Sequence, residues 1–211
     1  MTESTPISQT KTAALTRVLD LVARGYVHYT MGVCPVAKAT SLARKFHESY
    51  GIGITPAKRI TRKRQDEANS LLVMYWPRDA QGEVHWLLLA TPGKGAIWQQ
   101  ETLRDVTQTR LHWLGYEMVQ HASRGKASWT WRRPKQAMAE LYALIGEQLA
   151  HRHQAAVQET LERAAHQPGF AGVREQSWEL AQFARSRGYG RELPHLFFVQ
   201  KVAHGEPLVL S

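Results

Sequence analysis

The segment TPAKRITRKRQDEANSLLVMYW, which runs from Thr55 to Trp76, joins a dense group of cations to an apolar run. The six residues from Leu71 to Trp76 are apolar without alternation, which is typical of a central strand covered on both faces. Five cations precede this strand, and we call them the basic cluster: Lys58, Arg59, Arg62, Lys63 and Arg64. The segment therefore predicts a positive surface at one end of a β-sheet.

Thr55 and Pro56 bear on how the basic cluster is presented. Threonine is a preferred helix N-cap and proline is favoured at the first helical position, so the cluster either begins a short helix or forms an ordered loop. In both cases the cations lie on a folded edge. A fixed positive surface of this kind suits a phosphate backbone, which predicts nucleic-acid binding but indicates neither sequence specificity nor a reaction.

The overall composition is that of a folded basic protein. The chain has 211 residues, 43% of them hydrophobic, which argues against disorder and allows one good core, alone or with a small helical appendage. Lys and Arg outnumber Asp and Glu by 27 to 18, which gives a formal net charge of +9. This charge suits a polyanionic partner such as DNA or RNA, although many basic proteins bind neither.

Cys34 is the only cysteine, so an intramolecular disulfide and a cysteine-rich zinc site are excluded. It lies near a predicted helix start, which lowers a thiol pKa, but no partnering base is identifiable, so we interpret it as structural. Residues Met1 to Gln9 lack the apolar core of a signal peptide, and no run approaches the length of a membrane span. We therefore expect a cytoplasmic protein without membrane attachment.

Hydrophobic periodicity predicts an α+β fold. Helices are expected at about 10–24, 35–49 and 100–114, and a short β-prone run at 26–29 should end before Gly32. Two hairpins are expected, and together they favour an antiparallel sheet of about four strands covered by helices. The first hairpin joins 71–76 to 83–91, and the second joins 116–121 to 127–133.

The end of the chain predicts a helical extension. From Lys135 to about Gln167 only Gly146 interrupts a helical pattern, and a continuous helix here would be about 45–50 Å long. A further helix is expected at about 173–187, followed by a strand-like run at 195–202. We therefore expect three parts: a flexible leader at 1–9, an α+β core domain at 10–150, and a C-terminal helical extension with a terminal strand at 151–211.

A second group of cations, which we call the second basic group, lies in and just after the second hairpin: Arg124, Lys126, Arg132, Arg133 and Lys135. Trp129 and Trp131 lie on one face of the second strand of this hairpin. Such aromatics either stack on bases or fill the core, and we expect core. If the hairpins are adjacent, both basic groups share one edge; the alternative is two solvated regions on different sides. The predicted phosphate contacts are Lys58, Arg59, Arg62, Lys63, Arg64, Arg124, Lys126, Arg132 and Arg133.

Two other functions stay open. A phosphodiesterase using Mg²⁺ would need clustered carboxylates, and Glu101 and Asp105 share a helix face if 100–114 is helical, a spacing also typical of surface charge. Without metal, a ribonuclease would use histidines, and His28 and His47 neighbour the basic cluster in sequence. Alternatively, the long helix 135–167 docks on a protein partner or forms a homodimer.

Further motifs predict no cofactor and no metal site. Gly93-Lys94-Gly95 lacks the spacing of a Walker A motif and is interpreted as a loop. His151 and His153 lie two apart on the predicted helix, so they point to different sides and cannot bind one metal ion together.

Three segments resemble parts of uncharacterised proteins carried by proteobacterial plasmids and integrative conjugative elements. They are Ser128 to Arg132, Gly172 to Gln176, and Leu193-Pro194 leading into Phe198 to Lys201. The resemblance carries no catalytic residue. It implies a mobile-element context, where a small basic protein most often serves replication, partition, transfer or regulation. The leading hypothesis is therefore a non-enzymatic, nucleic-acid-binding accessory protein.

Overall fold

The structure is a computed structural model that describes residues 4–77, 82–123, 126–198 and 206–210. The chain forms two compact units, Met1–Thr109 with Val202–Ser211, and Arg110–Lys201, which we call the sheet unit and the bundle unit. The predicted α+β class is confirmed. The domain boundary that we predicted after residue 150 falls inside the bundle unit.

The sheet unit contains a six-stranded mixed sheet with the strand order β5-β2-β4-β3-β1-β9. The predicted first hairpin is confirmed, because β3 and β4 pair antiparallel with Leu72 opposite Leu88. The predicted four-stranded antiparallel sheet is wrong, since β1 pairs parallel with β3 and antiparallel with β9. The strands are β1 (Ser4–Ser8), β2 (His28–Pro35), β3 (Ser70–Tyr75), β4 (Glu83–Ala90), β5 (Arg104–Asp105) and β9 (Glu206–Val209).

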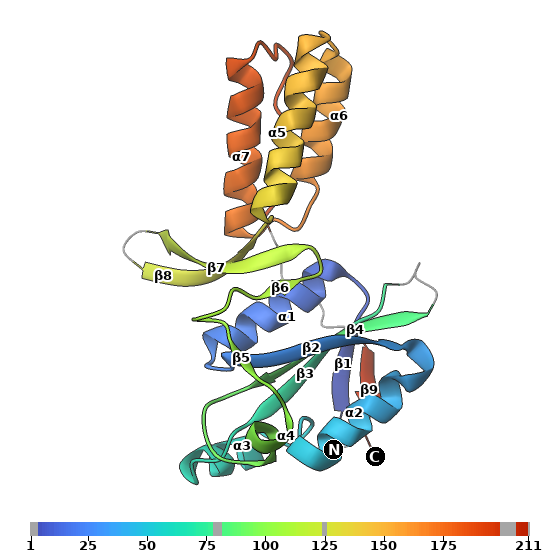
Figure 1. The fold of residues 1–211 in the computed structure, drawn as a ribbon, viewed down its shortest axis with the longest axis vertical. Helices are drawn as coiled ribbons and strands as arrows, with labels where there is room; N and C mark the ends of the chain where they lie inside the picture. The colour runs from blue at the N-terminus through green and yellow to red at the C-terminus, as the bar shows by residue number, and fades with distance from the viewer. Residues whose placement is uncertain (1–3, 78–81, 124–125, 199–205, 211) are drawn as a thin grey trace. The chain divides into compact units, whose positions relative to one another are not determined.

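Strand β3 lies at the centre of this unit, and every one of its residues is buried. Leu72 and Met74 belong to the same core cluster as Phe46 of helix α2. The alternate residues Leu71 and Val73 are equally buried on the other face, on the side of helix α1 (Figure 1). The prediction of a central strand covered on both faces is confirmed. The helices here are α1 (Lys11–Ala23), α2 (Val36–Tyr50), α3 (Pro56–Arg64) and α4 (Ala96–Gln100).

One unpredicted strand and one strand that is longer than predicted lie in the first part of the chain. Residues 4–8, predicted as part of a leader, form β1, in which the Thr5 hydroxyl donates to the Leu72 carbonyl at 3.1 Å. Strand β2 continues through Gly32, which was expected to end it. Gly32 lies opposite Trp86, and a Cβ atom there would lie 2.6 Å from the indole ring. The glycine therefore makes room for a cross-strand aromatic side chain.

The predicted helix at 100–114 is wrong. Only Ala96–Gln100 is helical, and Arg104–Asp105 forms β5, which pairs with β2. The Asp105 carboxylate accepts hydrogen bonds from the backbone and hydroxyl of Thr107, both at 2.7 Å. These bonds stabilise a turn that competes with the helix, since short polar side chains offer the backbone such alternatives.

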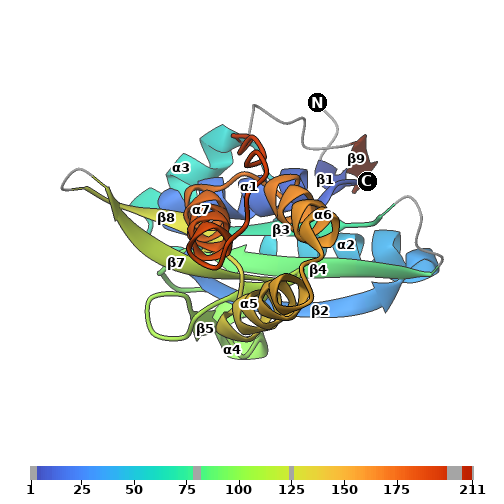
Figure 2. The same ribbon diagram turned by 90° about the horizontal axis from the view of Figure 1, so that it is seen from above.

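The bundle unit begins with a three-stranded antiparallel sheet and continues into three helices. The predicted second hairpin is confirmed, and Trp131 is fully buried, while Trp129 is half-buried. Figures 1 and 2 show the helices side by side, and Ile145, Val157 and Leu180 meet in their core. The elements are β6 (His112–Trp113), β7 (Tyr116–Ser123), β8 (Lys126–Arg132), α5 (Lys135–Ala150), α6 (Gln154–Ala165) and α7 (Ala171–Ser186).

The predicted continuous helix 135–167 is wrong, because α5 ends at Ala150 and α6 begins at Gln154. Arg152 between them has a φ of 57°, which reverses the chain direction and lets the apolar faces of both helices pack together. The expected helix at about 173–187 is confirmed as α7. Residues 195–198 are not in a strand, and the rest of the predicted strand 195–202 lies outside the described residues. Among the described helices, none is long and apolar enough to cross a membrane.

Candidate nucleic-acid interface

The basic cluster lies on helix α3, so the helical alternative is confirmed. The Thr55 hydroxyl accepts a hydrogen bond from the Lys58 backbone, and Pro56 occupies the first helical turn. The helix contains five cations and no carboxylate. Three of them lie in its last turn, where positive side chains complement the partial negative charge of the helix C-terminus.

Two cations of the cluster attach the helix to the sheet unit. Arg62 donates to the Tyr50 carbonyl at 2.8 Å and also lies 3.7 Å from the Glu67 carboxylate. Arg59 donates to the Ile52 carbonyl at 3.4 Å. Positions three apart share a helix face, so these two side chains face inward together. The remaining three cations of the cluster are exposed: Lys58, Lys63 and Arg64.

A pocket of about 460 Å³ lies beside this helix, within the sheet unit. Its wall combines the end of α1, one face of α3, and the loops that precede β3 and follow β4. Three cations line it, and three apolar side chains complete much of the remaining wall. The cations are Arg24, Arg59 and Lys63, and the apolar side chains are Tyr26, Ile60 and Pro92.

The cations around this pocket lie close enough to repel one another. Burial lowers the pKa of the Arg17 guanidinium, and the positive charges of Arg24 and Arg59 lower that pKa further. Burial raises the pKa of the Tyr26 phenol, while the positive charges of Arg59, Arg17 and Arg24 act in the opposite direction. Arg17 and Arg24 of the α1 region and Arg59 of α3 thus place three like charges around one aromatic ring, an arrangement that favours an anion beside them.

Backbone pairing fixes the loops of the pocket. The backbone N–H of Asn69 donates to the Thr91 hydroxyl at 2.9 Å, and the backbone N–H of Thr91 donates to the backbone carbonyl of Asn69 at the same distance. The Gly93-Lys94-Gly95 loop is held by the Lys94 amide, which donates to the Asp66 carbonyl at 2.7 Å. Gly93 has a φ of 134°, and a Cβ there would lie 2.7 Å from the Ala68 nitrogen. This loop therefore serves close backbone packing, a role that its interpretation as a plain loop did not include.

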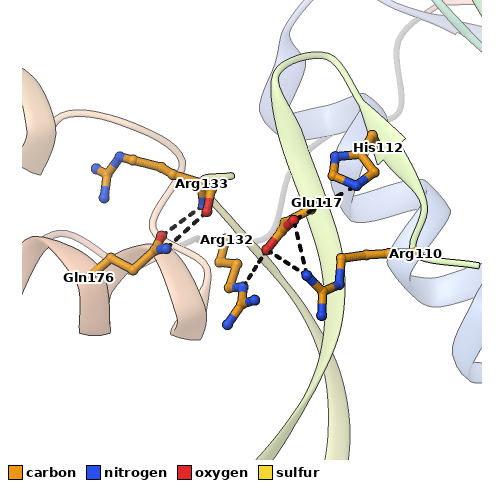
Figure 3. A network of polar contacts seen from close by, with 6 residues as sticks. All are labelled: Arg110, His112, Glu117, Arg132, Arg133 and Gln176. Atoms are coloured by element: carbon orange, nitrogen blue, oxygen red, sulfur yellow. Dashed lines mark hydrogen bonds and ion pairs between the residues drawn. The ribbon is translucent and has the colours of Figure 1, made fainter. Parts of the chain in front are cut away.

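The second basic group lies in the bundle unit. Arg132 Nε donates to the Glu117 carboxylate at 2.6 Å, and Arg110 approaches the same carboxylate at 3.4 Å (Figure 3). Glu117 is only 3% exposed. Arg124 and the side chain of Lys126 lie outside the described residues. The two basic groups belong to different units, so their predicted shared edge stays a prediction.

Arg133 is a structural residue. It is 3% exposed, and its guanidinium donates to the carbonyls of Ala164 and Val173, to the Ser177 hydroxyl and to Gln167. Its backbone forms two hydrogen bonds with the Gln176 amide, at 2.7 and 2.9 Å (Figure 3). We predicted Arg133 as a phosphate contact, but its donors are occupied inside the bundle unit, so it is left out of the candidate surface.

The residues considered for catalysis have separate structural partners. Tyr50 donates to Glu101 at 2.7 Å, and burial raises the pKa of this phenol well above its usual range, as does the neighbouring carboxylate. Burial acts to raise the Asp105 pKa, but hydrogen bonds from Thr107 bring it below its usual value. Glu101 is the C-cap of α4 and Asp105 lies in β5, so the prediction that they share a helix face is wrong.

The two candidate histidines have different environments. His28 lies 4.0 Å from the Asp105 carboxylate and packs against the edge of Trp98. His47 accepts a hydrogen bond from the Gly53 backbone at 3.2 Å. Within the described part of the chain, no group of three or more His, Cys, Asp or Glu could hold a metal ion. Cys34 lies in β2, and burial raises its thiol pKa, in contrast to the lowering expected at a helix start.

Fold and site together define an α+β protein whose sheet unit carries a cationic helix beside a positively lined pocket. Comparisons with models of protein families, with curated proteins and with solved structures found no match.

Proposed function

We propose that this protein binds nucleic acid through the exposed face of helix α3 and the adjoining rim of the pocket, as an accessory protein without a catalytic step. The observation that carries the proposal is the construction of α3. Inward Arg59 and Arg62 attach the helix to the sheet unit, and its outer cations are exposed without a carboxylate in the same helix. Like charges four residues apart, such as Lys58 with Arg62 and Arg59 with Lys63, destabilise a helix, so a polyanionic partner gives them a role.

The resemblance to proteins of plasmids and integrative conjugative elements supports a mobile-element setting for this activity. In that setting the protein would serve replication, transfer or their regulation. The contacts proposed here are with phosphates, so binding should be steeply dependent on salt. Four such contacts, from Lys58, Lys63, Arg64 and Arg24, correspond to a log–log salt slope of about −3 to −4.

The test is a titration of labelled single- and double-stranded DNA and RNA at several salt concentrations. The double variant Lys58→Ala, Arg64→Ala removes two exposed cations of α3 that do not line the pocket. We expect it to reduce the magnitude of the salt slope by about 1.4–1.8, because each lost phosphate contact removes about 0.7–0.9. Incubation of the same strands with Mg²⁺ tests the phosphodiesterase alternative by product formation.

The matched control is Lys38→Ala, Lys45→Ala, which removes two exposed cations from helix α2 of the same unit. Its net charge equals that of the α3 variant, so it reports the general effect of lost charge. Equal losses in both variants would show that α3 is not the binding surface. The absence of binding to all four nucleic acids at low salt would contradict the proposal itself.

A further inference from the structure

The pocket beside α3 has the size and composition of a small-molecule site. Its volume of about 460 Å³ lies within the range of roughly 300–1,000 Å³ that is usual for ligand pockets. Such sites are mostly apolar and contain a few polar groups that fix the orientation of the ligand. All of its lining residues belong to the sheet unit.

The charge of the pocket favours an anion. Arg24, Arg59 and Lys63 line it, and the two carboxylates that also line it each have a cationic partner outside the lining. Asp66 lies 3.9 Å from Lys94 Nζ, and Glu67 lies 3.7 Å from Arg62 Nε. Guanidinium and ammonium groups in this arrangement match a phosphate group, which accepts several charge-assisted hydrogen bonds at once.

Two buried polar atoms of the wall lack a partner among the described residues. Asn69 is only 5% exposed, and its Nδ2 donates to the Arg59 carbonyl at 3.0 Å, while its Oδ1 accepts no hydrogen bond. Arg59 Nε is likewise buried and unpaired. Because an unsatisfied buried polar group costs free energy, each such atom calls for a ligand or a special role. Here the wall offers one donor and one acceptor.

We infer that this pocket binds the phosphorylated end of a nucleotide, with the phosphate on Arg24, Arg59 and Lys63 and a base donor on Asn69. A nucleotide supplies both complements in one molecule, since its phosphate accepts from Arg59 and its base carries an N–H group. Tyr26, Ile60 and Pro92 provide the apolar surface for the base. The choice of ligand class rests on the proposed function, and the nucleotide is either free or the terminal unit of a strand.

The first experiment uses the full chain and isothermal titration with the four ribonucleoside 5′-monophosphates. Inorganic phosphate and the matching nucleosides serve as ligands that lack the base or the phosphate. We expect saturable binding of at least one monophosphate, weaker by about 10- to 100-fold for its nucleoside and for inorganic phosphate, because each lacks one half of the contacts. Equal affinity for inorganic phosphate would overturn the assignment of a nucleotide.

Variants separate this pocket from the outer face of α3. Arg24→Ala removes an exposed pocket cation and should weaken the monophosphate by about tenfold or more. Asn69→Ala should weaken the monophosphate but leave inorganic phosphate unchanged, and circular dichroism verifies its fold. Lys58→Ala, Arg64→Ala should leave monophosphate affinity intact even where strand binding falls. Monophosphate affinity that Arg24→Ala leaves unchanged would overturn the inference.

Oligonucleotides distinguish the two sources of the nucleotide. For a strand end, a short oligonucleotide with a 5′-phosphate binds more tightly than its 5′-hydroxyl counterpart, and Arg24→Ala abolishes the difference. For a free nucleotide, the monophosphate binds and the 5′-phosphate on the strand adds nothing. If neither a monophosphate nor a 5′-phosphate shows binding that depends on Arg24, the inference is wrong, while the salt-dependent strand titration still decides the proposed function separately.

Discussion

At the scale of single residues, burial separates arginines that look alike in the sequence. Arg59 and Arg62 are half-buried and bond backbone carbonyls, Arg132 pairs with a buried carboxylate, and Arg133 is enclosed by the bundle unit. Arg59 keeps an unpaired Nε that can still donate to an anion, whereas an arginine whose donors are all satisfied by the protein, such as Arg133, is not offered to a phosphate. The structural role of Arg133 therefore predicts a loss of stability when it is removed.

We predict that Arg133→Ala lowers the free energy of unfolding of the bundle unit by about 2–4 kcal/mol. The reason is that the Ala164 and Val173 carbonyls and the Ser177 hydroxyl lose a buried donor, and the side-chain volume becomes a cavity. The measurement is urea denaturation, with hydrogen exchange of peptides from α6 and α7 to locate the effect.

The matched control for this variant is Lys135→Ala, which removes an exposed cation two residues further along the chain. Exposed substitutions of this kind usually change stability by less than about 0.5 kcal/mol. Similar stabilities of the two variants would contradict the structural role given to Arg133.

At the scale of secondary-structure elements, glycines act in opposite ways in the two units. Gly32 lies in β2 against the Trp86 ring, whereas Gly146 lies inside α5 with no heavy atom within 4 Å of the position of an added Cβ. The first glycine is required by packing. The second only leaves the unfolded chain more flexible than alanine would.

We predict that Gly32→Ala destabilises the sheet unit by about 1–3 kcal/mol, because the added methyl displaces the indole that packs on Phe46. Gly146→Ala, as the counterpart, should stabilise the bundle unit by about 0.5–1 kcal/mol. Urea denaturation measures both effects, and hydrogen exchange assigns each to its unit. A neutral Gly32→Ala would show that Trp86 has room to move.

At the scale of the whole molecule, the chain leaves the sheet unit after Thr109 and returns to it near the C-terminus, where β9 pairs with β1. Leu210 is 3% exposed in the core of that unit. Six of the seven tyrosines, spread over both units, have raised pKa values, with burial as the largest cause in each. The raised pKa values of these tyrosines make the folding stability of the protein depend on pH in the alkaline range.

We predict that the protein loses stability as the pH rises above about 10, the ordinary tyrosine pKa. Phenols of the unfolded chain ionise from that pH, whereas the folded state keeps them protonated until their raised pKa values. The unfolded state therefore binds fewer protons in this range, and its relative free energy falls. Tyrosinate absorbance and circular dichroism, recorded together in an alkaline titration, should change at the same pH. Ionisation of most tyrosines near pH 10 with an unchanged circular dichroism spectrum would contradict this prediction.

The local elements of the fold were predictable wherever the signal was contained in neighbouring residues. Helices α1, α2, α3 and α7 and both hairpins follow from apolar periodicity, caps and turns, which act over a few residues. Three of the wrong predictions share one origin. Strand β1, the extension of β2 and the division at Arg152 depend on partners far along the chain, which stabilise segments whose own propensity is weak.

The features of the candidate site likewise divide into those that neighbouring residues predict and those that depend on contacts between distant segments. The sequence alone determined the basic cluster and indicated a helix as one of two alternatives for it, because charge and capping are properties of adjacent residues. Only the tertiary structure decided that Arg59 and Arg62 face inward, that Arg133 is buried, and that Arg24 and Asn69 meet in one pocket. Burial and pocket formation arise from contacts between segments distant in sequence, and no local pattern of residues contains the energies of those contacts.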